Sequence, residues 1–270
     1  MLRLVPTPIG NIGDITHRAS EALMSADILL CEDTRVTKKL LLLLQERYNL
    51  TPKADQEFYS LHSHNEKEFV EKLTPDFFDQ EVVYVSDAGM PSVSDPASLL
   101  VQYAQKHGIA YDVLAGANAA LVAYVASGFS ETQMLFWGFL PHKGSARSES
   151  LNGALYSGFV TVLYESVHRM QKLLGELEIL DPTREIFVAK ELTKLHQAYY
   201  KGTPSEVRAT LPQNPKGEWV VVLSSSEVST SGAISQSDIM GLDLPKKTKA
   251  KLLAKVTKRG IKECYEELMK

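Results

Sequence analysis

The sequence contains 270 residues, enough for about two domains, and its 44% hydrophobic and 23% charged residues are typical of a globular protein with a sizeable core. This composition excludes a chain that is disordered throughout. The net charge of -4 excludes a general basic coat for nucleic acid, although not a local basic patch. The two cysteines, Cys31 and Cys264, provide neither a disulfide framework nor a zinc spacing, so we expect a reducing compartment and no metal site.

Signals for export and for membrane insertion are also missing. Residues 1–6 lack the apolar core of a signal peptide. The longest aliphatic run, Leu40 to Leu44, is far shorter than the ~18 residues that a membrane span needs. We therefore expect a soluble, cytoplasmic protein that does not bind a membrane.

Short apolar strands alternate with amphipathic helices over the first part of the chain. Strands are predicted over residues 2–5, 27–31, 58–61, 82–86 and 110–114, and helices over 14–25, 34–45, 65–73 and 95–106. Continuous apolar strands separated by helices indicate a parallel sheet that is covered on both faces. We therefore predict a first α/β domain over residues 1–115.

A second set of elements follows a helix over residues 118–127, which is apolar almost all round and which we expect to be buried. Strands are predicted over 135–139, 160–164, 186–191, 198–201 and 219–223, and helices over 146–155, 167–178 and 204–211. Two of these strands lie too close together for a helix between them, which favours a mixed sheet. We assign residues 116–228 to a second α/β domain.

The last part of the chain has a different character. Residues 224–237 are rich in serine and without periodicity, which is typical of a linker. Helices are predicted over 246–258 and 262–269, interrupted at Gly260, within a small module of residues 238–270. Residues 246–262 hold eight basic side chains and no acidic one. Two interpretations stay open: an RNA contact that includes Lys246, Lys247 and Lys249, or a merely solvated helical face.

Several common signatures of enzymes are absent from the sequence. No G-x-G-x-x-G follows the first strand, and there is no G-x-x-x-x-G-K-[ST], G-x-S-x-G or H-E-x-x-H motif. What remains is a set of strand ends rich in Gly, Pro, Asp and Ser. Ligands of open α/β sheets bind at the carboxyl ends of the strands, so these loops are the candidate site.

Three such loops belong to the first domain. The segment PTPIGNIGDIT of residues 6–16 is stiffened by prolines and allows close backbone approach at its glycines, while Asp14 can cap the next helix. The segment LAGANAA of residues 114–120 is small enough for a flat ligand to lie against its backbone. Ordinary turns and close helix packing explain these two loops equally well.

The third loop, VSDAGMPSVSDP of residues 85–96, is longer and more specialised. Ser94 or Asp95 can cap the following helix, with Pro96 at its first position. Capping does not explain Asp87 and Gly89, which come earlier. A carboxylate facing a cleft can accept hydrogen bonds from a ligand amine or hydroxyl, so function is favoured over a simple Asx turn.

Charged residues follow the strands of both domains. In the second domain they occur in GFLPHK, followed by Arg147, in YESVHR and in KELTKLH; in the first domain CEDTR brings Arg35. Clusters of Arg, Lys and His at strand ends suit an anionic substrate such as a phosphate backbone. A solvated surface is the alternative for any single charge, and Glu32 or Asp33 can simply cap a helix.

The order of the blocks TPIGNIGDIT, CEDTR, SDAGMPSVSDP, FWGFLPHK, YESVHR, KELTKLH and KGEWVVVL resembles that of the bacterial 16S rRNA (cytidine-2′-O)-methyltransferases, a branch of the tetrapyrrole methylase superfamily. The resemblance covers residues 5–223, and the basic tail resembles the small helical module of that branch. It implies two α/β domains with S-adenosylmethionine in the cleft between them, and a homodimer. It also implies methyl transfer to the ribose 2′-hydroxyl of a cytidine in 16S rRNA, within the 30S subunit.

The resemblance also implies roles for individual residues. Cofactor contacts are expected from Pro8, Asp87, Ala88, Gly89, Met90, Asn118, Ala119, Tyr164 and Leu192. RNA contacts are expected from Arg35, Lys143, Arg147, Arg169 and Lys190, besides the three lysines of the tail. Five positions depart from the family pattern, which has Thr at Met90, Gly at Ala97, Pro at Ala117, Ser at Asn118 and Pro at Val167.

Methyl transfer to a hydroxyl benefits from a general base, because a protonated hydroxyl is a poor nucleophile. Glu165 and Glu191 are the candidates, since both end second-domain strands near the expected cleft. Two other functions stay open. One is a tetrapyrrole or corrinoid methyltransferase on the same fold, and the other is a non-catalytic RNA-binding protein with a degenerate cofactor cleft.

Overall fold

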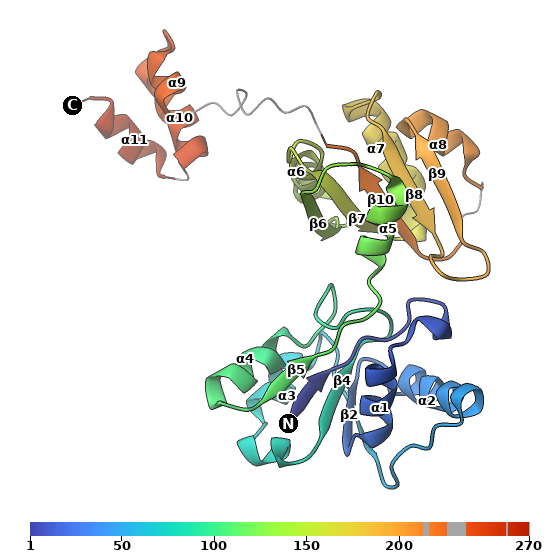
Figure 1. Ribbon diagram of the computed structural model, residues 1–270. Coiled ribbons are helices and arrows are strands. Elements are labelled where there is room, and N and C mark those ends of the chain that lie inside the picture. The colour runs from blue at the N-terminus through green and yellow to red at the C-terminus, as the bar shows by residue number, and fades with distance from the viewer. Residues whose placement is uncertain (213–215, 226–235, 258, 270) are drawn as a thin grey trace.

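A computed structural model describes residues 1–212, 216–225, 236–257 and 259–269 of the protein. Figure 1 shows two sheets with their helices, one formed by the first part of the chain and one by the second, with helix α5 (Ala119–Ser127) following the first sheet in the chain. Each sheet has five strands. The predicted α/β architecture is confirmed.

The first sheet is parallel throughout, in the order β3-β2-β4-β1-β5. Its strands are β1 (Leu2–Leu4), β2 (Ile28–Cys31), β3 (Glu57–Ser60), β4 (Val82–Val85) and β5 (Tyr111–Val113). Strands β2 and β4 are buried at every residue, as expected of continuous apolar segments covered on both faces. Because the strands are parallel, the loops that follow them all leave from one edge of the sheet.

Helices cover both faces of this sheet. On one face lie α1 (His17–Ser25) and α2 (Thr34–Tyr48), which pack around Leu23, Leu29 and Val83. On the other lie α3 (Glu66–Glu71) and α4 (Ser98–His107), with the 3-10 turn η2 (Pro75–Asp79), around Tyr84 and Leu100. Alternate residues of β2 and β4 therefore enter opposite cores, which fixes their register.

The second sheet is mixed, as predicted, in the order β6-β7-β10-β8-β9. Its strands are β6 (Met134–Phe139), β7 (Val160–Glu165), β8 (Ile186–Lys190), β9 (Ala198–Gly202) and β10 (Trp219–Leu223). Only the β6–β7 pair is parallel. On one face lie α6 (Gly144–Leu155), α7 (Met170–Leu180), preceded by the 3-10 turn η3 (Val167–Arg169), and α8 (Pro204–Thr210).

Helix α5 covers the other face of the second sheet, and it is less buried than the sequence predicts. Ala120 and Ala123 pack against the strands. Leu121 and Val125 are 54% and 77% exposed, so the prediction of a helix buried all round is wrong for one face. A strongly apolar helix with one exposed face leaves that face available to another surface.

The C-terminal residues form three helices that pack on one another. They are α9 (Gln236–Gly241), α10 (Lys246–Thr257) and α11 (Ile261–Glu267), with a small core of Ile239, Ala250, Leu253 and Cys264. The two predicted helices are observed, while α9 begins within the segment predicted as a linker; residues 226–235 of that segment lie outside the described residues. Figure 1 shows these helices apart from both sheets. Within the described chain, no helix has the length and apolar character needed to cross a membrane.

Two helices of the first domain begin later than the sequence predicts. Before α1, Asp14 ends the 3-10 turn η1 (Ile12–Asp14), and the Thr16 hydroxyl caps the helix instead by accepting the N–H of Ala19 at 3.1 Å. Before α4, residues 92–97 form a loop in which Ser92 and Ser94 have φ angles of 67° and 71°. Helix α4 begins at Ser98, after this loop, so neither Ser94 nor Asp95 is its N-cap.

The N-terminus of α4 is capped from another helix. The N-cap residue is Ala97, with φ of 112°, and its side chain makes no cap. Instead, the Glu66 carboxylate of α3 accepts the backbone N–H groups of Ala97 and Leu99 at 2.8 and 3.0 Å. Glu66 is 9% exposed, and a negative charge at a helix N-terminus is favourable. One buried side chain therefore ties α3 to the loop of residues 92–97.

We expect Glu66→Ala to lower the free energy of unfolding by about 1–3 kcal/mol, because one buried and one partly buried N–H group lose a charged acceptor. Urea unfolding followed by circular dichroism measures this loss. Glu68→Ala is the matched control: it is the same change in the same helix, but Glu68 is exposed and pairs with the exposed Lys72. Equal midpoints for the two variants would contradict the capping role.

Candidate active site

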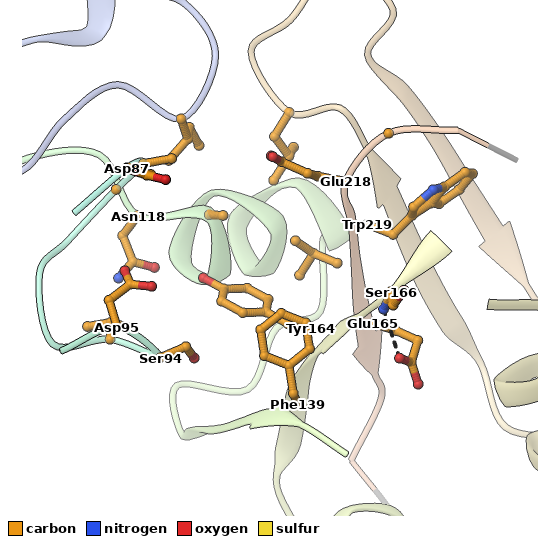
Figure 2. Close-up of a pocket in the computed structure, with 18 of the residues that line it drawn as sticks. Asp87, Ser94, Asp95, Asn118, Phe139, Tyr164, Glu165, Ser166, Glu218 and Trp219 are labelled. Atoms are coloured by element: carbon orange, nitrogen blue, oxygen red, sulfur yellow. Dashed lines mark hydrogen bonds between the residues drawn. The ribbon is translucent and has the colours of Figure 1, made fainter. Parts of the chain in front are cut away.

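A pocket of about 540 Å³ lies between the carboxyl edge of the first sheet and the second sheet. Figure 2 shows Asp87, Asp95 and Asn118 on one side, with Tyr164 and Phe139 opposite them. The lining residues come from both domains: Ile9, Glu32, Asp87, Ala88, Gly89, Met90, Val93, Ser94, Asp95, Asn118, Ala119, Phe139, Tyr164, Glu165, Ser166, Val167, His168, Leu192, Gly217, Glu218, Trp219 and Val220. Cavities of ~300–1,000 Å³ are typical of small-molecule and cofactor sites.

Hydrogen bonds between loops build the first-domain wall of this pocket. Thr7 and Gly89 exchange two backbone hydrogen bonds of 3.0 Å, which joins the loops after β1 and β4. The Asp87 carboxylate accepts the N–H of Asp33 at 3.0 Å, and the Glu32 carboxylate accepts the N–H of Asp87 at 3.2 Å. The loop after β2 is thereby fastened to the loop after β4, with the backbone at Gly89 in the left-handed region (φ 85°).

The first loop also reaches the second domain. The backbone N–H of Asn11 donates to the Thr193 hydroxyl at 3.0 Å. A side chain at Gly10 would place its Cβ 2.7 Å from Thr193 Oγ1 and 2.8 Å from the Leu192 carbonyl oxygen. Glycine is therefore required at residue 10 for this approach of the two loops.

Aromatic rings form the second-domain side. The ring of Tyr164 lies 5.5 Å from that of Phe139 at an angle of 63°. Burial raises the pKa of Tyr164 to about 12, so its hydroxyl stays neutral. Phe139 is 55% exposed although it lines the pocket, which places a large uncovered ring at the opening.

Three carboxylates line the first-domain side, from Glu32, Asp87 and Asp95. Burial, and then the charges of Glu32 and Asp87, raise the pKa of Asp95 to about 7, against a hydrogen bond from Ser86 that lowers it. Burial and the charge of Glu32 also raise the pKa of Asp87. Among the described residues, no group of three or more acidic, His or Cys side chains is placed to hold a metal ion. The carboxylates instead give the pocket a negative potential that suits a cationic ligand.

Glu165 lines the pocket through its backbone, but its carboxylate belongs to a buried cluster. It pairs with Arg169 at 2.7 Å and with Arg147 at 3.1 Å, and its side chain is fully buried. Arg147 pairs in turn with Glu176 at 2.8 Å. In Figure 2 the carboxylate of Glu165 points away from Tyr164 and accepts the N–H of Ser166. Both oxygens are occupied and face away from the cleft, so the geometry corrects the assignment of Glu165 as a base.

The second predicted base, Glu191, also has its carboxylate in ion pairs and hydrogen bonds. Its Oε1 accepts Lys194 Nζ at 3.0 Å and the backbone N–H of Glu218 at 2.9 Å. Burial raises the pKa of Glu191, but these hydrogen bonds outweigh burial and hold it below its ordinary value. Glu191 does not line the pocket, although Leu192 and Glu218 beside it do. A lowered pKa makes it a weak proton acceptor.

The predicted cofactor residues gather at the pocket. Eight of the nine line it, and Pro8 does not, although its neighbour Ile9 does. Met90 and Asn118, which depart from the family pattern, are among the eight. The Asn118 side-chain oxygen also caps α5 by accepting the N–H of Leu121 at 3.1 Å. Their contacts with a cofactor stay predictions.

The predicted RNA-binding residues are scattered, and none of them lines the pocket. Arg147 is 1% exposed and held in the buried cluster, so the prediction of an RNA contact is corrected for this residue. Arg35 is exposed but paired with Asp33 at 2.6 Å, while Lys143 is exposed. Arg169 pairs with Glu165, and Lys190 Nζ lies 5.8 Å from the centre of the Trp219 ring.

The tail lysines differ in exposure. Lys246 and Lys247 are exposed at the start of α10, while Lys249 donates to the Met240 carbonyl oxygen at 2.8 Å. A lysine that joins α9 to α10 contributes to the packing of the module. Lys246 and Lys247 are therefore the better candidates for contacts with a phosphate backbone.

Several lining residues were not predicted as site residues, above all Asp95 and Phe139. The motif Ser-Asp-Pro before a helix is an ordinary capping pattern, which concealed Asp95. Phe139 ends an apolar strand and is indistinguishable in sequence from a core residue. The sequence did contain a signal for Asp95, because Ser-Asp occurs twice in SDAGMPSVSDP and one helix needs only one cap. The second Ser-Asp pair therefore left an acidic residue that capping does not explain.

Comparison with known proteins agrees with this geometry. Residues 1–208 match the model of the Tetrapyrrole (Corrin/Porphyrin) Methylases. Curated proteins named Ribosomal RNA small subunit methyltransferase I match over nearly their full length: that of Campylobacter fetus is 44% identical over 100% of both chains, and that of Helicobacter pylori is 46% identical over 98% of this chain and 96% of its own. The chain belongs to the tetrapyrrole methylase family, in this ribosomal RNA branch. The predicted family is thus confirmed.

Solved structures of this family share its fold at low identity. A cobalt precorrin-4 methyltransferase is 16% identical, with a TM-score of 0.57, over 83% of this chain and 94% of its own. A uroporphyrin-III C-methyl transferase of Thermus thermophilus, solved with S-adenyl homocysteine, is 16% identical with a TM-score of 0.55, over 82% of this chain and 96% of its own. At such identity these methylases support the fold and not the substrate.

We expect Glu165→Gln to destabilise this tetrapyrrole methylase by about 3–5 kcal/mol, because the change leaves two arginines of the buried cluster without their shared partner. Chemical unfolding measures the loss. Glu178→Gln, which changes an exposed pair with Arg208, is the matched control and should unfold like the wild type. An E165Q protein of unchanged stability that had lost only its turnover would restore Glu165 as a base.

Proposed function

We propose that the protein transfers a methyl group from S-adenosylmethionine to the ribose 2′-hydroxyl of a cytidine in 16S rRNA, acting on the 30S subunit in the bacterial cytoplasm. The pocket carries this proposal, because it joins eight predicted cofactor residues to an aromatic wall of the second domain. The curated relatives of 44% and 46% identity bear the name of a small-subunit rRNA methyltransferase, which supports the acceptor class.

The residues of the pocket fit S-adenosylmethionine in size and in charge. Its volume of about 540 Å³ leaves room for a nucleoside-sized cofactor together with part of an acceptor. The carboxylates of Glu32, Asp87 and Asp95 can offset the positive charges of the sulfonium and of the ammonium group. Glycine suits residue 89, because its φ of 85° lies in the left-handed region and a Cβ there would lie 3.3 Å from Ile9 Cγ2. When bound, the cofactor supplies an activated methyl group on a cationic sulfur.

The protein itself contributes the alignment of the reacting atoms and a pocket that shields them from water. Methyl transfer needs the attacking oxygen in line and within roughly 3–3.5 Å of the methyl carbon, and such alignment is worth about 7–11 kcal/mol. The bonds between Thr7 and Gly89 hold the first-domain wall of the pocket together, and the bond between Asn11 and Thr193 joins that wall to the second domain. Phe139 and Tyr164 cover the second-domain side with apolar surface.

The two alternative functions are less well supported. A tetrapyrrole acceptor is suggested by the names of solved neighbours, but these are only 15–16% identical in the uroporphyrin-III methyltransferases, against 44% for the rRNA relative from Campylobacter fetus. A non-catalytic RNA-binding protein would have no reason to keep an open pocket lined by the cofactor loops. The basic face at Lys246 and Lys247 favours a nucleic-acid substrate over a tetrapyrrole.

A homodimer belongs to the same proposal. Leu121 and Val125 leave a largely exposed apolar face on α5, directly after the loop of residues 114–118. A second copy covering this face would remove apolar surface from water beside the cofactor pocket.

The reaction itself tests the proposal. With labelled S-adenosylmethionine and purified 30S subunits that lack the modification, we expect label in 16S rRNA and 2′-O-methylcytidine as the product nucleoside by mass spectrometry. Naked 16S rRNA is assayed in parallel and separates free RNA from the assembled subunit as substrate. A different methylated nucleoside contradicts the assigned position. No incorporation into either RNA, by a protein that binds the cofactor, contradicts the acceptor.

The basic tail generates a separate prediction. We expect the double variant Lys246→Ala/Lys247→Ala to bind 16S rRNA more weakly, and the slope of log K against log salt to become shallower by about one to two, because each lost phosphate contact releases fewer counterions. Filter binding at several salt concentrations measures both quantities. The matched control is Lys67→Ala/Lys72→Ala, two exposed lysines of the first domain that pair with Glu71 and Glu68. Unchanged binding and slope would mean that Lys246 and Lys247 are merely solvated.

A further inference from the structure

The pocket contains more than the cofactor is expected to occupy. After the predicted cofactor residues are set aside, the charged and aromatic lining that remains includes Asp95, Phe139, His168 and Glu218. Asp95 and Phe139 belong to different domains. This remaining part is where the acceptor must lie, so the inference below rests on the proposed function.

The loop of Asp95 reaches across to the strand that carries Phe139. A Cβ placed on Gly138 would lie 3.6 Å from Ser94 Oγ, so the residue before Asp95 lies close to the residue before Phe139. Figure 2 shows Ser94 and Asp95 on the first-domain side of the pocket, with the Phe139 ring facing them from the second domain. An exposed aromatic ring next to a carboxylate can hold an unstacked nucleobase by stacking, with its ribose beside the carboxylate.

Asp95 differs in its partners from the other carboxylates in and beside the pocket. Glu165, Glu191 and Glu218 pair with arginine or lysine. Glu32 and Asp87 accept backbone N–H groups. Among the described residues no cation pairs with Asp95; the groups that act on it are the Ser86 hydroxyl, the two carboxylates of Glu32 and Asp87, and the phenols of Tyr84 and Tyr164.

The backbone around Asp95 is strained and held in place. Ser94 and Ala97 have φ angles of 71° and 112°, which are unfavourable for residues with a side chain. The N–H of Ser92 donates to the Pro96 carbonyl oxygen at 3.1 Å, and Glu66 accepts the N–H of Ala97 at 2.8 Å. Strain that surrounding contacts maintain is typical of functional loops.

We propose that Asp95 is the general base of the methyl transfer, and that the base of the target nucleotide stacks on Phe139. The Asp95 carboxylate takes the proton of the 2′-hydroxyl while the bond from that oxygen to the methyl carbon forms. The bond from the methyl carbon to sulfur breaks with its electron pair left on sulfur. The products are a 2′-O-methyl ribose, a neutral thioether and a protonated Asp95, so atoms and charge balance.

The protonation of Asp95 is suited to this role. The burial and the two carboxylates that raise its pKa to about 7 make it a stronger base than an ordinary aspartate. A cationic ligand in the same pocket favours the charged carboxylate and so lowers the pKa of Asp95. Binding of the methyl donor therefore leaves Asp95 ionised when it has to accept a proton.

Proton release on ligand binding tests this without any turnover. Calorimetric titration of the wild type with S-adenosylmethionine at pH 7, in buffers of different ionisation enthalpy, should show a fraction of a proton released. Asp95→Asn should bind the cofactor and release fewer protons. Binding of S-adenosylhomocysteine, whose sulfur is neutral, should release fewer protons from the wild type than S-adenosylmethionine does. Equal release by the wild type and D95N would overturn the inference.

The second measurement is the pH dependence of single-turnover methyl transfer into 30S subunits. The wild-type rate should rise with pH and level off above the pKa of Asp95, since only the carboxylate accepts the proton. D95N should be ~100- to 10,000-fold slower and lack this inflection, while Asp95→Glu should keep an inflection and part of the rate. Asp112→Asn, outside the pocket on β5, is the control and should match the wild type.

The outcomes separate the two proposals. A wild type that labels 30S subunits beside a D95N protein of similar rate, or one that keeps its inflection, refutes the role of Asp95 and leaves the proposed function standing. A D95N protein that turns over cytidine normally but also methylates uridine at that position would make Asp95 a specificity residue instead. A wild type that labels no RNA refutes the proposed function. The calorimetric test of Asp95 still gives a result in that case, because it needs no RNA.

For the stacking partner, a fluorescent cytidine analogue at the target position of a short RNA provides the readout. Binding of the wild type should quench its fluorescence, and Phe139→Leu should remove most of the quenching while Phe159→Leu, at an exposed phenylalanine outside the pocket, should not. Equal quenching by wild type and F139L would refute the stacking of the target base.

Discussion

The parallel pairing of β1, β2 and β4 is the constraint on which the rest of the structure depends. Because these strands run in one direction, the loops after Leu4, Cys31 and Val85 emerge side by side at one edge. Their backbones can then exchange hydrogen bonds, as Thr7 does with Gly89, without any further element to bring them together. The carboxylates of the pocket are neighbours for the same reason, and their mutual repulsion follows from the sheet topology.

The two domains differ in whether their buried carboxylates are paired with cations. In the second domain, Glu165 sits between Arg147 and Arg169 with no water contact, so its charge is neutralised and its position is fixed. In the first domain, Asp87 and Asp95 face a cavity, and among the described residues neither forms an ion pair with a cation; Arg35, whose charge acts on Asp87, pairs with Asp33 instead. The first arrangement contributes rigidity at the end of β7, next to Tyr164. The second leaves an unbalanced negative potential, which only a bound cation can offset.

Periodicity and composition were sufficient to predict most of the fold, because the strands of both sheets are continuous apolar segments and turn residues separate them. The positions of Asp87, Gly89 and Asn118 at the pocket followed from their places after strands. Glu165 and Arg147 were misassigned for a physical reason: a charged residue after a strand has the same sequence signal whether it meets solvent or a buried partner. Arg147 lies on α6 and its partner Glu176 on α7, and the spacing of these residues in the sequence does not indicate their contact.

The helix limits show the same dependence on distant contacts. A local capping pattern predicted α4 from Asp95 onward, but Glu66 from α3 supplies the cap and moves the start to Ser98. This displacement frees residues 92–97 from the helix and turns Asp95 toward the pocket. Reaching that arrangement requires left-handed backbone at non-glycine residues, which costs free energy that local sequence cannot supply. The position of Asp95 therefore depends on the cap from Glu66 and on the packing of α3 against α4. A substitution in the core around α3 can shift the loop of residues 92–97, and this shift changes the position of Asp95 in the pocket.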